Sequence, residues 1–498
     1  MKAQNLSVGL LFFLSLTFSD TIAQKKPNVL FIAVDDLKPF LEPYGNKIVK
    51  SPAINQIAAK GIVFEKNYCQ QAVCAPTRAS LLTGLRPDRT GVWDLKTNFR
   101  LVDSTIVSLP QYLQTQGYET AGLGKIYHPA VETTFPGHDP KSWSVPYIET
   151  VAPAYVLSDK KPSVESADVH DTTYYDGKTA TYAVQSLAKL AKGDKPFFLA
   201  VGFKKPHLPF VAPKKYWDLY QREQFTVDPF QEKSKNSPDV AYHISGELKS
   251  YSDIPDFDSY SDIPEKKLSV EKQKELLHGY YAAISYTDAQ IQKLLNELDR
   301  LGIANNTIVV LWGDHGWHLG DHGLWNKHSN FENATRATLL FSVPWIKGGV
   351  KTSSITEFVD VFRTLVDLLK LPLPSGLDGK SLVPIIKNPK ATIHQFAVSQ
   401  YPRPNGVMGY TIRTDKYRYT EWLENYKSYQ PYDQKKVIAR EFYDYEKDPQ
   451  EKVSEILNPA YKTLIDELAH KLEAHLTQQY KVSQKHPGVA TFYQKKQL

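Results

Sequence analysis

The sequence has 498 residues, of which 42% are hydrophobic, 12% aromatic and 23% charged. This composition is typical of a soluble globular protein and excludes a collagen, a coiled-coil rod and a disordered chain. The presence of only two cysteines excludes a disulfide framework. The formal net charge of +6 suits an anionic ligand but is too small over this length to identify one, and we expect no nucleic-acid partner.

The first residues have the layout of a secretory signal peptide. Lys2 precedes an apolar run over residues 6–18, and the small residue Ala23 precedes Gln24. The run is shorter than the roughly 20 residues that a membrane span needs, which disfavours a membrane anchor; a buried strand is the other alternative. We therefore expect a signal peptide over residues 1–23, a periplasmic or secreted mature protein, and no later membrane span.

Four apolar runs, each followed by ionisable side chains, predict a buried parallel sheet. The runs cover residues 28–34, 120–123, 196–201 and 307–312. They do not alternate with polar residues, which is typical of strands covered by helices on both faces. Open α/β sheets bind ligands at the carboxyl ends of such strands, so we expect one shared site there. The ionisable residues that follow the runs are Asp35, Asp36, Lys125, His128, Lys204, Lys205, His207, Asp314 and His315.

The segments between these runs predict one long helix and two loops. Residues 276–298 carry apolar side chains at three- and four-residue spacing, which predicts a helix packed on the core and ended by Gly302. Residues 250–264 contain Ser-Tyr-Ser-Asp-Ile-Pro twice and predict an extended surface loop. Residues 140–176 are rich in Tyr, Pro, Ser and Asp, and we expect them to lie at the rim of a cleft.

The end of the chain differs in character from the rest. Residues 395–400, 407–414 and 417–422 predict strands, with a hairpin turn between the last two. Residues 460–479 predict a terminal amphipathic helix. We therefore expect a large α/β domain over residues 24–384 and a small α+β subdomain over residues 385–498.

Cys74 lies in an unusual sequence, Cys74-Ala-Pro-Thr-Arg78, which is followed by Ala-Ser-Leu-Leu-Thr-Gly84. Residues 79–85 predict a helix with Cys74 at its N-terminus, where backbone N–H groups favour an anion. Arg78 lies one turn further on, and its fork of donors suits a tetrahedral oxyanion. The alternative is a small buried thiol, the usual state of a lone cysteine, and this is what we expect for Cys69.

This pattern resembles the signature of the type I sulfatases, in which the cysteine is converted after translation to Cα-formylglycine. The resemblance covers most of the mature chain and is closest to the iduronate-2-sulfatase branch. It implies an α/β fold like that of alkaline phosphatase, with a large mixed sheet flanked by helices and a smaller C-terminal α+β subdomain. The segments that carry it are residues 34–37, 70–84, 124–129, 198–210, 281–286, 314–320, 327–331 and 399–404.

The resemblance also implies a Ca²⁺ site. Its ligands would be Asp35, Asp36, Asp314, His315 and the converted Cys74. Carboxylates provide the hard oxygen ligands that calcium prefers, and the preceding buried strand disfavours the alternative that Asp35 and Asp36 cap a helix. His315 departs from the amide of most sulfatases but matches the iduronate-2-sulfatase branch. Because imidazole is a poor calcium ligand, His315 either ligates the ion or contacts the sulfate.

The remaining residues take roles in sulfate-ester hydrolysis. The negative ester repels nucleophiles, so an enzyme must offset its charge and supply a positioned attacking oxygen. By the resemblance, one hydroxyl of hydrated formylglycine attacks sulfur and the other later expels sulfate. His207 protonates the leaving sugar oxygen, and His128 helps to deprotonate the second hydroxyl. Lys125 and Lys327 bind sulfate oxygens, and Arg78 supports the formylglycine.

Three further residues bear on the substrate. Trp317 occupies a position that lines the sugar pocket in this branch, and His328 stands where a tyrosine is expected, which leaves the sugar open. Lys205 either contacts substrate or is a solvated surface lysine. We expect a secreted sulfatase that acts on uronic acid-containing sulfated polysaccharides or oligosaccharides, either a glycosaminoglycan or the algal polysaccharide ulvan. Its expected protein partner is a formylglycine-generating or equivalent maturation enzyme.

Two other functions stay open. A phosphate or phosphonate monoester hydrolase of the same superfamily could use the converted cysteine, and only substrate assays separate it from a sulfatase. A catalytically silent polysaccharide-binding protein could use the many aromatic residues, which include 30 Tyr and 8 Trp. Every expected reactive position is filled, which disfavours the silent protein.

Overall fold

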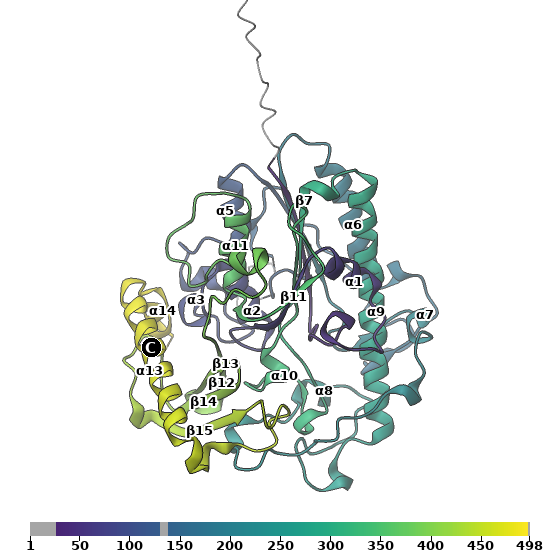
Figure 1. The fold of residues 1–498 in the computed structure, drawn as a ribbon. Helices are drawn as coiled ribbons and strands as arrows, with labels where there is room; N and C mark the ends of the chain where they lie inside the picture. The colour runs from purple at the N-terminus through teal and green to yellow at the C-terminus, as the bar shows by residue number, and fades with distance from the viewer. Residues whose placement is uncertain (1–25, 130–137, 497–498) are drawn as a thin grey trace, which may run out of the picture.

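The structure is a computed structural model, and it describes residues 26–129 and 138–496. The expected signal peptide, residues 1–23, lies outside the described residues. Within the described ranges, no helix combines the length and the apolar character needed to cross a bilayer. Figure 1 shows a large sheet edge-on between layers of helices, with a smaller sheet and the C-terminal helices beside one end of it.

The central sheet, within the described residues, has seven strands in the order β11-β2-β10-β7-β1-β5-β3. They are β1 (Asn28–Val34), β2 (Ile62–Tyr68), β3 (Glu119–Gly124), β5 (Phe197–Phe203), β7 (Thr307–Gly313), β10 (Leu339–Ser342) and β11 (Val350–Glu357). β1 pairs in parallel with β5 and β7, and β3 pairs in parallel with β5, which confirms the four predicted strands. β10 runs antiparallel to both of its neighbours, so the sheet is mixed as expected.

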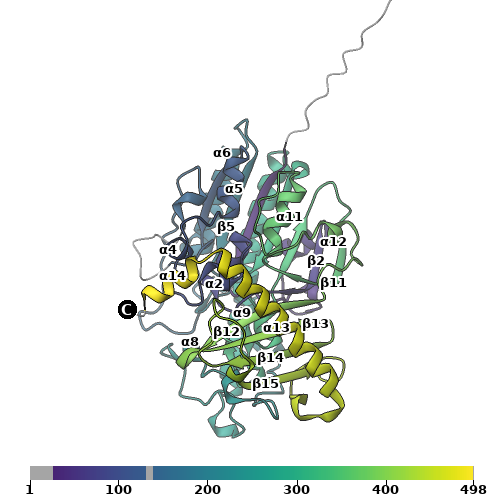
Figure 2. The same ribbon diagram turned by 90° about the vertical axis from the view of Figure 1, so that its left-hand side faces the viewer.

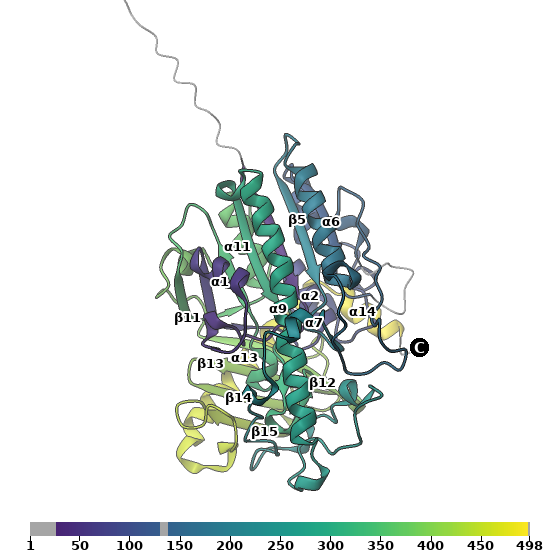
Figure 3. The same ribbon diagram turned by 90° about the vertical axis from the view of Figure 1, so that its right-hand side faces the viewer.

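Helices cover both faces of this sheet (Figures 1 and 3). Successive residues of β1 belong to different cores: Phe31 packs with one layer, and Leu30 and Ile32 pack with the other. This explains the absence of polar alternation in the sequence, because both faces of the strand are buried. The first layer contains α2 (Cys74–Thr83), α5 (Leu109–Thr115) and α11 (Asp360–Leu368), and the second contains α1 (Pro52–Ala59), α6 (Tyr175–Leu190) and α9 (Val270–Arg300).

α9 confirms the predicted long helix and extends it at its N-terminal end. The side chain of Ser269 caps the helix by accepting a hydrogen bond from the backbone N–H of Lys272. Gly302 follows the helix with φ of +67°, the left-handed conformation that ends many helices. The repeat over residues 250–264 lies between α8 (Gly246–Lys249) and α9 and forms no strand or α-helix, which confirms the predicted loop.

The C-terminal part contains a second, antiparallel sheet (Figure 2). Its strands are β12 (Phe396–Arg403), β13 (Val407–Thr414), β14 (Tyr417–Leu423) and β15 (Val437–Asp444), in that order. The predicted hairpin between β13 and β14 is confirmed. α13 (Lys462–Lys485) packs Leu468, Leu472 and Leu476 onto this sheet. It is followed by α14 (Gly488–Lys495), which the sequence did not predict, and the domain boundary at residue 385 stays a prediction.

Shorter elements complete the described structure. The short helices are α3 (Pro87–Thr90), α4 (Phe99–Val102), α7 (Lys214–Trp217), α10 (Glu332–Thr335) and α12 (Val383–Lys387). The short strands are β4 (Val164–Glu165), β6 (Phe210–Val211), β8 (His318–Leu319) and β9 (Trp325–Asn326). β8 and β9 pair with each other just beyond the carboxyl end of β7, where the predicted site lies.

Candidate active site

The carboxyl ends of β1 and β7 bring the predicted acidic residues together. The backbone N–H of Asp36, just after β1, donates to Oδ1 of Asp314, just after β7, over 2.9 Å. Asp36 has φ of 58°, a left-handed conformation that aspartate tolerates better than most residues. Tyr280 of α9 holds this turn, because its hydroxyl donates to the carbonyl oxygen of Asp36 over 2.7 Å and accepts from the backbone of Lys38 over 3.1 Å.

The ends of β3 and β5 place Lys125 at the same edge of the sheet. The backbone N–H of Lys125 donates to the carbonyl oxygen of Gly202 over 2.9 Å. A Cβ atom at Gly202 would lie 2.1 Å from the carbonyl oxygen of Lys125, so only glycine permits this approach. The ammonium of Lys125 then forms an ion pair with Asp35.

Cys74 is the first residue of α2, as the sequence predicted, and its side chain faces the acidic cluster. Its Sγ lies 3.6 Å from Nε2 of His315 and 3.9 Å from Nζ of Lys125. Burial raises the pKa of the Cys74 thiol well above its usual value, even though Lys125 opposes the shift. The residue is 2% exposed and carries no negative charge as a thiol, so the unmodified side chain is a poor nucleophile.

Arg78 lies one turn further along α2 and is fully buried. Its Nε donates to Asp314 over 2.9 Å, and its Nη2 donates to Asp35 over 2.8 Å. Its Nη1 donates to the carbonyl oxygens of Lys125 and Ile126 over 2.6 and 3.1 Å. Each nitrogen of the guanidinium is therefore engaged by the protein, and Arg78 fixes the carboxylates in place.

The donor atoms fit a divalent cation. Asp36, Cys74, Asp314 and His315 place one ligand atom each within 4.8 Å of one another, and Asp35, Asp36, Cys74 and His207 do the same. Burial raises the pKa of Asp36 well above its usual value, and the charges of Asp35 and Asp314 add to the effect, although Lys327 opposes it. A cation among these carboxylates would relieve that cost.

His315 directs an unprotonated ring nitrogen toward the other metal-ligand atoms. Its Nδ1 lies 2.8 Å from the carbonyl oxygen of Gly316, which can only accept a hydrogen bond, so Nδ1 carries the proton. Burial lowers the pKa of His315 to about 4, which leaves the imidazole neutral. The lone pair of Nε2, 3.3 Å from Oδ1 of Asp36, is then available to a metal ion.

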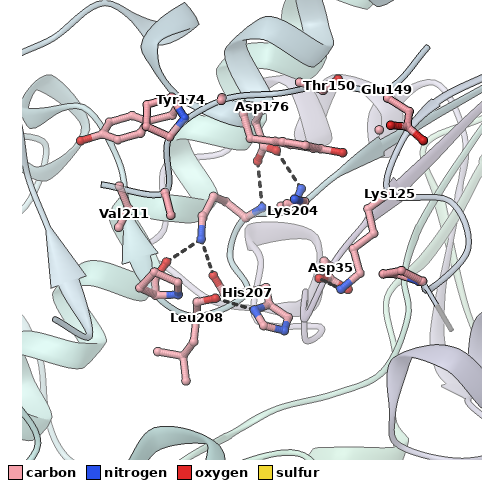
Figure 4. Close-up of a pocket in the computed structure, with 18 of the residues that line it drawn as sticks. Asp35, Lys125, Glu149, Thr150, Tyr174, Asp176, Lys204, His207, Leu208 and Val211 are labelled. Carbon is pink, nitrogen blue, oxygen red and sulfur yellow. Dashed lines mark hydrogen bonds and ion pairs between the residues drawn. The ribbon is translucent and has the colours of Figure 1, made fainter. Parts of the chain in front are cut away.

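Lys125, His128 and His207 line a cavity of about 590 Å³ beside this cluster (Figure 4). His207 donates from Nδ1 to the carbonyl oxygen of Leu208 over 2.5 Å, which turns its Nε2 toward the acidic residues. Nδ1 of His128 is buried and has no hydrogen-bond partner among the described residues. Burial lowers the pKa of His128 to about 4 and that of His207 to about 3, with the nearby lysines adding to the effect. Tyr147, Glu149, Tyr174 and Tyr175 also line the cavity, which confirms that residues 140–176 contribute to its wall.

Lys205 supports the turn that carries His207. Its ammonium donates to the carbonyl oxygens of His207 and Pro209 over 2.7 and 2.5 Å. Asp176 accepts the backbone N–H groups of both Lys204 and Lys205 over 2.8 Å, as the dashed lines of Figure 4 show. Lys205 is therefore not a solvated surface lysine; it lines the cavity, and its contact with substrate stays a prediction.

Lys327 pairs with Asp36, whereas Lys125 pairs with Asp35. Its Nζ lies 3.2 Å from Oδ2 of Asp36 and 4.7 Å from the ring centre of Trp317. Trp317 has no exposed surface, so the structure shows it packed against the ammonium of Lys327. The expected contact between Trp317 and a sugar stays a prediction.

Glu247 of α8 is a site residue that the sequence did not predict. Its carboxylate lies 2.9 Å from Nζ of Lys327 and 3.4 Å from Nε2 of both His207 and His328. His328 in turn lies 2.5 Å, through Nδ1, from the hydroxyl of Tyr401. The sequence around Glu247 contains neither an apolar run nor a motif, so only the tertiary contacts reveal it.

Comparison with known proteins agrees with this geometry. The family model described as Sulfatase matches residues 27–371, and a model described as N-sulphoglucosamine sulphohydrolase, C-terminal, matches residues 320–479. The iduronate 2-sulfatase of Homo sapiens is 34% identical over 471 residues, which cover 80% of this chain and 85% of that protein. The ulvan-active sulfatase of Formosa agariphila is 27% identical, covering 91% of this chain and 81% of that protein.

Solved structures share the fold. A protein in complex with its substrate D-glucosamine-2-N,6-O-disulfate superposes with a TM-score of 0.74 at 22% identity, covering 92% of this chain and 98% of that one. The phosphonate monoester hydrolase of Agrobacterium radiobacter superposes with a TM-score of 0.70 at 20% identity, covering 91% and 96%. The matched family model and the iduronate 2-sulfatase relative establish that this chain belongs to the sulfatase family, as a sulfuric ester hydrolase.

Proposed function

We propose that the protein is a secreted or periplasmic sulfatase that hydrolyses sulfate esters on uronic acid-containing polysaccharides or their oligosaccharides. The observation that carries the proposal is the position of Cys74, which lies within 3.9 Å of Lys125 and within 3.6 Å of His315 at the N-terminus of α2. The names of the human and Formosa relatives, an iduronate 2-sulfatase and an ulvan-active sulfatase, support a uronate-containing substrate.

The charges of the site suit a sulfate ester. Among the described residues, the cluster contains four carboxylates and three Lys or Arg side chains. Its formal charge without a metal is therefore negative by one unit. A divalent cation would make it positive by one unit, which one sulfate monoester anion would balance. A phosphate monoester carries more negative charge near neutral pH and would be balanced less well. The carboxylates belong to Asp35, Asp36, Asp314 and Glu247, and the cations are Arg78, Lys125 and Lys327.

Two groups that the unmodified chain lacks complete the proposal. Asp35, Asp36, Asp314 and His315 would hold Ca²⁺, which supplies positive charge beside the sulfate. Conversion of Cys74 to formylglycine, by a maturation enzyme, supplies in the hydrated form one hydroxyl for attack on sulfur and a second for release of sulfate. A metal beside residue 74 is consistent with the 4.8 Å grouping of its Sγ with these ligand atoms.

Side chains of the protein itself would bind the sulfate oxygens and transfer the protons. Lys125 is paired with Asp35 and Lys327 with Asp36, and their ammonium groups would turn from these carboxylates toward the sulfate oxygens. Nε2 of His207 would carry the proton that passes to the leaving sugar oxygen, because its Nδ1 is held by Leu208. Because burial lowers the pKa of His207, this role requires that the carboxylate of Glu247 and the bound ester anion stabilise the protonated ring during the reaction. His128, whose Nδ1 has no hydrogen-bond partner among the described residues, would accept a proton during release of sulfate.

A panel of sulfated disaccharides tests the proposed function, with sulfate release followed by ion chromatography. We expect release from 2-O-sulfated uronates, at a kcat/KM at least about 100-fold above that for matched phosphate and phosphonate monoesters, a ratio worth about 2.7 kcal/mol. Faster phosphate or phosphonate hydrolysis would favour the alternative hydrolase, and no release from any ester would favour the silent binding protein. Mass spectrometry of the peptide around Cys74 should show loss of the thiol, and an active preparation with only cysteine would contradict the formylglycine mechanism.

A further inference from the structure

Three basic side chains of the site converge on the carboxylate of Glu247. Nζ of Lys327 lies 2.9 Å from Oε2, and Nε2 of His207 lies 3.4 Å from Oε1. Nε2 of His328 lies 3.4 Å from Oε2. The Glu247 side chain is 22% exposed, so this carboxylate lies at the boundary between the buried cluster and solvent.

Lys327 depends on Glu247 for its position. A lysine ammonium is a point charge on a flexible stem and takes its place from its partners. The two anions within reach of Lys327, among the described residues, are Asp36 and Glu247. If Asp36 binds a divalent cation, its oxygens are shared with that ion, and Glu247 is the anion left to hold the ammonium.

Glu247 itself is anchored from the second sheet. His328 connects it to the hydroxyl of Tyr401 on β12, at 2.5 Å from Nδ1 of the imidazole. Arg403, also on β12, donates to the carbonyl oxygen of His328 over 2.8 Å. The carboxylate therefore stands at the end of a hydrogen-bonded chain that begins in the C-terminal sheet and ends at the site.

We propose that Glu247 is a positioning residue that holds the ammonium of Lys327 and Nε2 of His207 toward the sulfate ester, with Tyr401 and His328 fixing the carboxylate. The inference rests on the proposed sulfatase function. Its consequence is specific to the leaving group. A misplaced His207 cannot deliver a proton, which matters for a sugar alcohol and matters little for a phenol that leaves without protonation.

The test is Glu247→Gln, which keeps the shape of the side chain and removes its charge. We expect kcat/KM for the best sulfated disaccharide of the panel to fall about 100-fold, mainly through kcat, and that for 4-nitrophenyl sulfate to fall less than about tenfold. Glu247→Asp should recover part of the loss on the disaccharide. Glu265→Gln is the matched control, since Glu265 is exposed and lies in a short 3-10 helix before α9, and it should leave turnover of both substrates unaffected.

Equal losses on both substrates, or no loss on either, would overturn the inference. If Glu247→Gln fails to fold, as judged by its circular dichroism, Tyr401→Phe replaces it as the test. That variant should lower disaccharide turnover about three- to tenfold and spare the aryl sulfate, and an unchanged ratio between the two substrates would count against the role of Glu247. A wild-type enzyme that releases sulfate from neither substrate would instead refute the proposed function, so the two failures are distinguishable.

Discussion

Two regions of the molecule bury clusters of charge, and they differ in whether a group of metal-ligand atoms and a cavity accompany the charges. In the C-terminal sheet, Arg418 is 1% exposed and pairs with Glu451 and with Glu441. Glu451 also accepts a hydrogen bond from the hydroxyl of Tyr445 over 2.6 Å. Within the part of the chain that the structure describes, none of these residues belongs to a group of metal-ligand atoms.

At the edge of the large sheet, the carboxylates exceed the cations and a cavity of about 590 Å³ opens beside them. Arg78 is as deeply buried as Arg418, and Asp36 lies beside Lys327 and two imidazoles. The comparison teaches that burial and ion pairing alone do not mark a functional site. What marks it is a group of metal-ligand atoms beside a cavity.

The largest effect on turnover should come from Cys74→Ala. We expect kcat to fall at least about 10⁴-fold, because the residue that carries the nucleophile is removed, while the melting temperature changes little. The matched control is Cys69→Ala, since Cys69 is equally buried but belongs to neither group of metal-ligand atoms found among the described residues. Sulfate release and thermal unfolding are measured for both variants. An active Cys74→Ala enzyme would contradict the proposed catalytic role of Cys74.

Removal of the metal should have the next largest effect. EGTA should lower turnover at least about 100-fold, since several kcal/mol of charge stabilisation are lost, and added Ca²⁺ should restore it. Mg²⁺ should restore it poorly, because it requires a tighter octahedral set of oxygens. At a calcium concentration of about 100 times Kd, the ion should also stabilise the fold by about 2.7 kcal/mol. Full activity in metal-free protein, verified by elemental analysis, would show that the acidic cluster needs no metal ion for turnover.

The smallest effect on turnover should come from Arg418→Met, in the cluster of the C-terminal sheet. Loss of the guanidinium leaves Glu451 buried without its cation, so the free energy of unfolding should fall by about 3–5 kcal/mol. Turnover per folded molecule should stay within about twofold of wild type, because Arg418 contacts no residue of the cavity. Urea unfolding and initial rates measure the two quantities. A tenfold loss of turnover in folded protein would show that the two clusters are coupled.

Local patterns were sufficient for the framework of the site. Uninterrupted apolar runs report strands covered on both faces, and the polar residues that end them must lie at one edge of a parallel sheet. Asp36, Asp314 and Lys125 were therefore placed together correctly. β10 was not predicted, because a short strand of four residues carries no signal of its direction or its neighbours.

Local sequence patterns did not indicate the contacts between segments that lie far apart in the chain. Glu247 reaches Lys327 across 80 residues of chain, and nothing near either residue indicates the partner. The sequence left two roles open for Lys205, a contact with substrate and a solvated surface position. It does not show that the ammonium donates hydrogen bonds to the carbonyl oxygens of His207 and Pro209. The packing of Trp317 against Lys327 was not indicated by the sequence either, and its expected contact with a sugar stays a prediction.

The burial of α2 has a consequence for the biosynthesis of the enzyme. All ten residues of this helix are buried, and its first residue is Cys74. If Cys74 is converted as proposed, the converting enzyme would have to take the side chain into its own catalytic pocket, which the finished fold does not permit. Conversion would then have to precede closure of the polypeptide, and a host without the converting machinery would accumulate folded, inert protein that later treatment could not repair.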